Sequence, residues 1–275
     1  MLIELRLEVL KVLRKPRTYV GPVAMGLLIA AVLVGLKYSH PFDNVEKRLA
    51  QDFIICGSFI NAAFLTRYLL DGIVYMFLPL FTCVVCGDLI ASEAADGTLR
   101  TLLCRPVRRS SVAASKYAVC VAYVVALVLG TGLAAYLAGS ALLGRGSLVL
   151  HEEGIWILPE RTAIGRLVAA YALVAVGMVA VGSISFMIST FLSNSNGAIA
   201  VAIGILYGSA VIGQIDFFAK LRPYLLTTHL DAWQHFFAGA LDVQLLARSV
   251  AALLIYSALA LLIGLLIFER RDILS

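Results

Sequence analysis

Six apolar stretches dominate the sequence, and each is long enough to cross a lipid bilayer as a helix. They are residues 18–36, 72–91, 117–137, 167–192, 197–215 and 250–268. A crossing helix needs about 20 mostly apolar residues, and inside hydrocarbon its backbone hydrogen bonds must be satisfied within the segment. Only 14% of the 275 residues are charged, against about 25% in soluble globular domains. The sequence therefore predicts an all-α, multi-pass membrane protein with six transmembrane helices.

Lysine and arginine accumulate on the side of the membrane that holds both ends of the chain. Twelve of the 22 basic residues and seven of the 17 acidic residues lie on this side, so the formal net charge of +5 is located there entirely. Cytoplasmic loops retain basic residues. Both termini are therefore predicted to be cytoplasmic, with the protein in the cytoplasmic (inner) membrane. Retention of basic residues beside anionic lipid accounts for the excess charge, so no nucleic acid is expected as a partner.

The six crossings divide the rest of the chain into segments on the two sides. The predicted cytoplasmic segments are a helix at 1–17, a loop at 92–116, a turn at 193–196 and a tail at 269–275, and the predicted exoplasmic segments are 37–71, 138–166 and 216–249. Residues 53–65 are apolar enough for a seventh crossing, but that crossing would place the basic loop outside. We therefore expect an interfacial or re-entrant helix there, ending near Arg67.

The first 15 residues combine apolar and charged side chains with the periodicity of an amphipathic helix, which Pro16 ends. This pattern predicts a helix that lies in the inner headgroup layer. The alternative is a cytosolic extension of the first crossing.

The loop at 92–116 is more elaborate than a simple connection. Leu99, Leu102 and Leu103 have helical spacing between a helix start at Gly97-Thr98 and a stop at Pro106. Basic residues flank this apolar ridge: Arg100, Arg105, Arg108 and Arg109. An apolar ridge with a basic rim is suited to docking into a groove on another protein. The alternative is that the arginines only contact lipid headgroups.

The same loop resembles a sequence pattern of ABC-2 type permeases, the membrane subunits of ATP-driven exporters. The matching residues are Glu93, Gly97, Thr98, Leu99, Leu102, Leu103, Pro106, Val107, Arg108, Arg109 and Lys116. Arg108 departs from the pattern, which usually has serine at this position. The basic amphipathic start, the six crossings, the short turn between the fourth and fifth, and the Phe-Glu-Arg-Arg-Asp run at 268–272 are also similar to this family.

The resemblance implies an ABC-2 type exporter fold and a separate cytosolic ABC ATPase as partner. Residues 93–116 would carry a coupling helix that fits a cleft on that ATPase, with the leucines as apolar contacts and the arginines as the polar rim. The turn formed by Ser193, Asn194, Ser195 and Asn196 would supply a second, smaller contact. The chain would pair with a second copy of itself and export an unknown substrate by alternating access, with ATP and Mg bound by the ATPase. The alternative function is a membrane scaffold that recruits a cytosolic partner without transport.

Two patterns within the crossings leave more than one interpretation open. Ala200, Gly204 and Gly208 recur every four residues, which allows close approach of a helix from a second copy or from the same chain. Hydroxyl side chains gather in the fourth crossing, where they would line a path or bond back to helix carbonyls. They are Ser183, Ser185, Ser189 and Thr190, followed just beyond the crossing by Ser193 and Asn194.

Residues for catalysis, metal binding or nucleotide binding were not found in the sequence. A phosphate-binding loop needs a Gly-Lys pair, which does not occur in this chain. Cys83 and Cys86 are interpreted as packing residues, and His229, Asp231 and His235 as a polar helix face. We therefore expect that the chain is not an enzyme and that it binds no cofactor itself.

Overall fold

The computed structural model describes residues 2–39, 60–97, 109–151, 155–238 and 241–270. The helices are α1 (Leu2–Arg14), α2 (Pro16–Ser39), α4 (Ala62–Tyr75), α5 (Phe77–Ala95), α7 (Arg109–Leu142), α8 (Glu160–Phe191), α9 (Ser195–Gln214), η1 (Asp216–Tyr224), α10 (Leu226–Leu230), η2 (Asp231–Phe237) and α11 (Val243–Arg270). Two short strands, β1 (Leu148–His151) and β2 (Ile155–Leu158), pair antiparallel.

Six of the described helices are long and apolar enough to cross a membrane: α2, α5, α7, α8, α9 and α11. The prediction of a largely helical, multi-pass membrane protein is confirmed at this level. The helices extend beyond the predicted crossings, most clearly α7, which has 34 residues. At 1.5 Å per residue a helix of this length is about 50 Å long, so it projects beyond a hydrocarbon core of about 30 Å.

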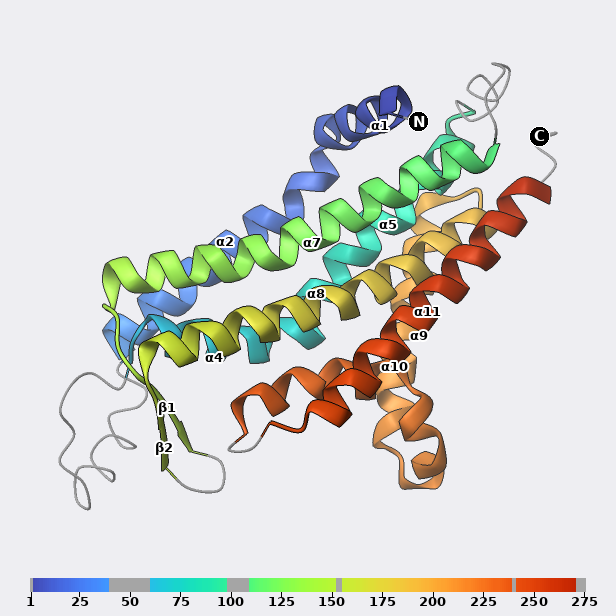
Figure 1. Cartoon of the computed structure of the whole chain (residues 1–275). Helices are drawn as coiled ribbons and strands as arrows, with labels where there is room; N and C mark the ends of the chain where they lie inside the picture. The colour runs from blue at the N-terminus through green and yellow to red at the C-terminus, as the bar shows by residue number, and fades with distance from the viewer. Residues whose placement is uncertain (1, 40–59, 98–108, 152–154, 239–240, 271–275) are drawn as a thin grey trace.

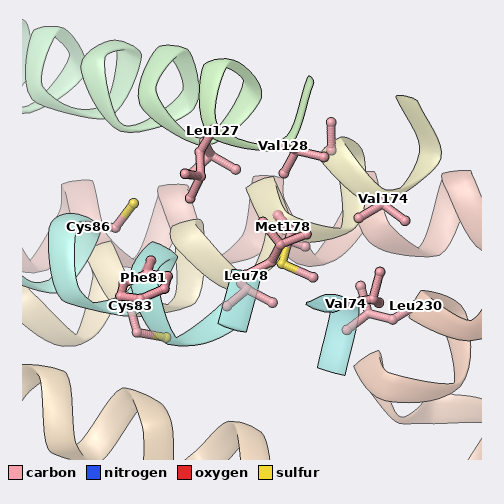
Figure 2. Close-up of a cluster of buried hydrophobic side chains, with 14 of the residues drawn as sticks. Val74, Leu78, Phe81, Cys83, Cys86, Leu127, Val128, Val174, Met178 and Leu230 are labelled. Atoms are coloured by element: carbon pink, nitrogen blue, oxygen red, sulfur yellow. The ribbon is translucent and has the colours of Figure 1, made fainter. Parts of the chain in front are cut away.

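Helices α5 and α8 form the centre of the bundle (Figure 1). In the most apolar window of each, 67% of residues are buried, compared with 28% in α2, 22% in α11 and 17% in α9. Figure 2 shows side chains of α5, α7 and α8 packed in one cluster, including Phe81, Leu127 and Met178. Leu230 of α10 belongs to the same cluster. The three less buried helices leave most of their apolar surface on the outside of the chain.

The predicted second crossing, 72–91, is interrupted near its start, and the helix long enough to cross is α5, which begins at Phe77 and continues to Ala95. Helix α4 ends at Tyr75 and α5 begins at Phe77. Pro79 explains the break, since its ring nitrogen cannot donate to the Tyr75 carbonyl and its ring clashes with that carbonyl. The expected helix ending near Arg67 instead continues to Tyr75, and residues 40–59 lie outside the described part of the chain.

The predicted exoplasmic loop at 138–166 holds the β1–β2 hairpin, which the sequence analysis did not anticipate. The start of α4 is fixed to the chain leading into this hairpin. Asn61 caps α4 by accepting from the Phe64 amide at 3.0 Å, and its Nδ2 donates to the Ser147 carbonyl at 2.7 Å. The Ala62 amide donates to the Gly144 carbonyl at 3.0 Å, and Gly144 has a φ of 83°, which favours glycine.

Close packing between α7 and α8 depends on Gly132. A Cβ at this position would lie 2.7 Å from the ring of Tyr171, a residue that is itself buried. We expect Gly132→Ala to lower the free energy of unfolding by about 1–3 kcal/mol, because the ring cannot move without displacing its neighbours. The matched control is Gly130→Ala, where nothing lies within 4 Å of the added Cβ. Thermal unfolding of the two variants in detergent measures the difference, and equal melting temperatures would contradict the packing argument.

Candidate functional site

Four charged side chains meet where α1 packs against the ends of α5 and α7. The Lys116 ammonium lies 2.8 Å from Glu8 Oε2 and 2.8 Å from Glu93 Oε1. Lys11 Nζ lies 2.9 Å from Glu8 Oε1 and 3.1 Å from Glu93 Oε1. The side chain of Lys116 is only 1% exposed. We call Glu8, Lys11, Glu93 and Lys116 the charge cluster.

One charged residue of α1, Glu8, faces the bundle. Glu8 is buried together with Val12, whereas Leu7, Leu10 and Leu13 are exposed. A buried carboxylate is costly unless it is paired and hydrogen-bonded. Lys116 and Lys11 supply these partners, so α1 is held to the bundle by charge pairing as well as by its apolar residues.

The pKa values of Glu8 and Lys11 reflect this pairing. Burial raises the pKa of Glu8, but the ammonium groups of Lys116 and Lys11 outweigh it, so the pKa lies below its usual value. Burial lowers the pKa of Lys11, but the carboxylates of Glu8 and Glu93 outweigh it, so the pKa lies above its usual value. Both groups therefore stay charged at neutral pH.

A second cluster joins the turn between α1 and α2 to the start of α9. The Asp88 carboxylate of α5 lies 2.8 Å from Lys15 Nζ and 2.8 Å from Arg17 Nη1. The same carboxylate accepts a hydrogen bond from Ser195, and Lys15 also donates to Ser92 Oγ at 2.8 Å. We call Lys15, Arg17, Asp88 and Ser195 the elbow cluster.

The elbow cluster lines an open cavity of about 330 Å³ at this end of the bundle. Asn194, Ser195 and Asn196 form one wall, and Asn194 caps α9 by accepting from the Asn196 amide at 3.1 Å. Three of the four residues predicted as the second cytoplasmic contact therefore face the cavity that the α1–α2 turn also lines. Ser193 is exposed beside them.

The residues of the predicted coupling loop are only partly described. Glu93, Gly97, Arg109 and Lys116 are placed, and Gly97 follows α5 with a φ of 67°. The others lie outside the described residues: Thr98, Leu99, Arg100, Leu102, Leu103, Pro106 and Arg108. Arg109 begins α7 and donates to the Glu269 carbonyl of α11 at 3.3 Å. The structure thus brings Glu93 and Lys116, from the two sides of the loop, into direct contact.

The partners of these residues were not predicted from the sequence. Glu8, Lys11, Lys15, Arg17 and Asp88 entered only as part of the charge total on the predicted cytoplasmic side. One available signal was Glu8 and Lys11, a pair spaced for contact on one helix face. Their contacts with residues about 70 to 110 positions away carry no local signature.

The small-residue pattern of α9 points away from its own bundle. Ala200, Gly204 and Gly208 are exposed, whereas Ala198 and Leu206 are buried on the opposite face. A Cβ at Gly204 or Gly208 would meet nothing within 4 Å. This face is not used for packing within the described part of the chain.

The hydroxyls of α8 are engaged inside the bundle. Ser189 and Thr190 donate to carbonyls three residues earlier in their own helix, at 2.7 Å each. Ser185 donates to the Cys83 carbonyl of α5 at 3.2 Å, and Ser183 donates to the Val179 carbonyl at 2.7 Å. These four side chains are buried, which favours structural bonding over the lining of a path.

Candidate metal ligands do not assemble within the described ranges. No group of three or more His, Cys, Asp or Glu side chains that could hold a metal ion occurs there. Cys83, Cys86 and Cys120 are buried thiols without a disulfide. His229 instead contacts Ser249 Oγ at 3.4 Å and the Pro223 carbonyl at 3.1 Å.

Comparisons with known proteins identify one family and one relative. Residues 49–274 match the family described as "Protein of unknown function (DUF2705)". The chain is 27% identical over 202 residues to the uncharacterized protein YhcI of Bacillus subtilis (strain 168). This alignment covers 70% of the chain and 64% of YhcI, so the chain spans less than two thirds of the length of that relative.

Proposed function

The chain belongs to the DUF2705 family, and we propose that it is the permease subunit of an ABC-2 type exporter, driven by a separate cytosolic ATPase. The observation that carries the proposal is the ion pair between Glu93 and Lys116, with 2.8 Å between nitrogen and oxygen. These two residues belong to the sequence pattern that resembles ABC-2 permeases, and they are the two ends of the segment 93–116 that would carry the coupling helix.

The surroundings of this ion pair are suited to transmitting movement. Glu93 lies in the last turn of the centrally buried α5 and Lys116 lies in α7, and both contact α1 through Glu8 and Lys11. A push on the coupling segment would therefore reach two crossings and the N-terminal helix together. Closure of an ATPase pair would shift the equilibrium between two arrangements of the membrane halves, which is alternating access.

The remaining parts of the proposal follow from charge and from the outer surface. Both termini and the coupling segment would be cytoplasmic, because the excess of basic residues lies on their side. The exposed face of Ala200, Gly204 and Gly208 would meet α9 of a second copy, as small residues allow close helix approach. ATP and Mg would be bound by the ATPase, and the transported substrate would pass between the two membrane halves.

The proposal predicts that Leu102→Pro abolishes binding of the ATPase while leaving membrane insertion intact, because proline breaks the coupling helix. The matched control is Leu102→Met, which keeps an apolar helix former at this position. The tagged chain is purified in mild detergent from its source cells, and the co-purified subunit is measured by ATP hydrolysis. Equal recovery of the ATPase with both variants would contradict the docking assignment.

Substrate-stimulated ATP hydrolysis separates transport from the scaffold alternative. An exporter shows hydrolysis that rises when its substrate is added to the reconstituted complex. A complex that binds the ATPase without any such rise across amphipathic drugs, lipids and peptides would favour the scaffold. Labelling of a Thr101→Cys variant from the cytoplasmic side tests the orientation, and labelling from the outside would overturn it.

A further inference from the structure

An apolar groove opens between α7 and α8 on the surface of the bundle. Its volume is about 330 Å³, and its walls are Leu129, Gly132, Leu133 and Tyr136 of α7 and Ile164, Leu167, Val168 and Tyr171 of α8. Thr66 of α4 completes the lining. Leu133 and Val168 are 61% and 62% exposed, so the groove faces outward from both walls.

The floor of the groove offers no polar group to water. The Thr66 hydroxyl donates to the Ala62 carbonyl at 2.7 Å, and the Tyr171 hydroxyl donates to the Thr66 carbonyl at 3.1 Å. A water molecule is retained in a cavity only with two or more polar partners. An empty apolar groove would forfeit the dispersion contacts of its walls, so an apolar occupant is favoured.

The groove is shorter than one leaflet of a bilayer. Its lining runs from Ile164 to Tyr171 on α8 and from Leu129 to Tyr136 on α7, seven residues or about 10 Å along each helix. The hydrocarbon core is about 30 Å thick, so the groove covers about a third of it. Ile164 lies one turn after the start of α8, which is beside the hairpin at the end of the bundle opposite α1 (Figure 1). The occupant therefore enters from the leaflet on that side, and part of a single acyl chain fills the groove.

Charged groups of both signs lie at the shallow end of the groove. The Tyr136 hydroxyl, which lines the groove, donates to Glu160 Oε1 at 3.3 Å. Arg145 lies in the connection between α7 and β1, nine residues after Tyr136, and is exposed. A guanidinium pairs well with a phosphate, and a carboxylate accepts from a primary ammonium.

We propose that this groove binds one acyl chain of a phospholipid whose headgroup carries a phosphate and a primary ammonium, as phosphatidylethanolamine does. The phosphate pairs with Arg145 and the ammonium with Glu160, while the chain lies along Leu133 and Val168. This inference does not depend on the proposed transport function, because it uses only the groove, its depth and the charges at its shallow end.

Retention of lipid by the purified chain tests the proposal. The chain is extracted in mild detergent, incubated with dioleoyl phosphatidylethanolamine or dioleoyl phosphatidylcholine, and the bound lipid per chain is counted by native mass spectrometry. We expect Leu133→Trp, whose ring fills the groove, to reduce bound phosphatidylethanolamine at least tenfold. The matched control is Leu137→Trp, at a residue 54% exposed on the same helix but outside the groove. Equal retention by the two variants would overturn the proposal.

A second variant tests the headgroup separately from the acyl chain. Glu160→Gln keeps an acceptor for Tyr136 but removes the charge, so the preference for phosphatidylethanolamine over phosphatidylcholine is expected to fall from at least tenfold to about one. An unchanged preference would exclude the ammonium contact. If a Val168→Cys variant forms disulfide-linked dimers in the membrane, a second copy covers the groove and the lipid site is wrong.

Discussion

Replacing Lys116 with methionine is expected to lower the free energy of unfolding by about 3–5 kcal/mol, the cost of breaking a buried ion pair from one side. The two carboxylates that Lys116 bridges, Glu8 and Glu93, are 6% and 13% exposed. Without Lys116 both carboxylates lose their buried cation, and the Lys11 ammonium that they also contact is 44% exposed and therefore more strongly screened. Thermal unfolding of the purified chain in detergent measures the loss.

Detachment of α1 should accompany this loss, because Glu8 is its deepest charged residue. Val12, which is buried in the intact chain, would become reactive as Val12→Cys in the Lys116→Met background. Lys220→Met is the matched control, since Lys220 is exposed in η1. The neutral combination Glu8→Gln, Glu93→Gln and Lys116→Met should recover much of the stability, because no unpaired charge remains buried. If Lys116→Met and Lys220→Met unfold at the same temperature, the charge cluster does not hold α1.

The sequence predicted the crossings better than the lengths of their helices. Hydropathy reports which residues lie in hydrocarbon, and it therefore located α7 at 117–137. It could not include Arg109 or Lys116, because a charged residue reads as a boundary even where a distant carboxylate pairs with it. The structure places both residues within α7. One of the two carboxylates that pair with Lys116, that of Glu8, is 108 positions away.

The reading of a charged residue as a helix boundary also explains why the end of α4 was predicted too early. Arg67 suggested the end of an interfacial helix, yet it lies in the middle of α4, with its guanidinium carbon 5.2 Å from the centre of the Phe237 ring. A cation above an aromatic ring is stabilised there, and that ring comes from η2, far along the chain. The break at Met76, in contrast, was readable from Pro79 alone, since proline excludes the hydrogen bond to the residue four positions earlier.

Of the candidate site, the sequence predicted Glu93 and Lys116 through a family pattern and the α8–α9 turn through its short polar composition. It could not predict that two clusters would bind these elements to α1 and α2. Helical periodicity describes one helix at a time, whereas these contacts join five helices, α1, α2, α5, α7 and α9. The elbow cluster is the clearest case, since Asp88 is the only acidic residue inside a predicted crossing and its partners come from two other segments.

Asp88→Asn is expected to release the turn between α1 and α2 from α5 and α9. The asparagine retains an acceptor for Ser195 but removes the charge that holds Lys15 and Arg17, each 2.8 Å away. Each charge-assisted hydrogen bond contributes about 1.5–3 kcal/mol, and because both cations are partly exposed, screening reduces each of the two contributions to about 0.5–1.5 kcal/mol. The expected loss is therefore about 1–3 kcal/mol of local stability.

Hydrogen exchange provides the measurement, because it reports local opening of the first turn of α9 and of the α1–α2 turn separately. Exchange of these amides should accelerate about 5- to 150-fold in Asp88→Asn, the factor that corresponds to about 1–3 kcal/mol, while amides in the middle of α8 keep their rates. The matched control is Asp96→Asn, since Asp96 lines the same cavity but is exposed at the end of α5. Unchanged exchange at the start of α9 would mean that Asp88 does not couple these helices. Acceleration confined to the two turns, in contrast, would establish that the elbow cluster holds α2 and α9 together independently of the charge cluster beside it.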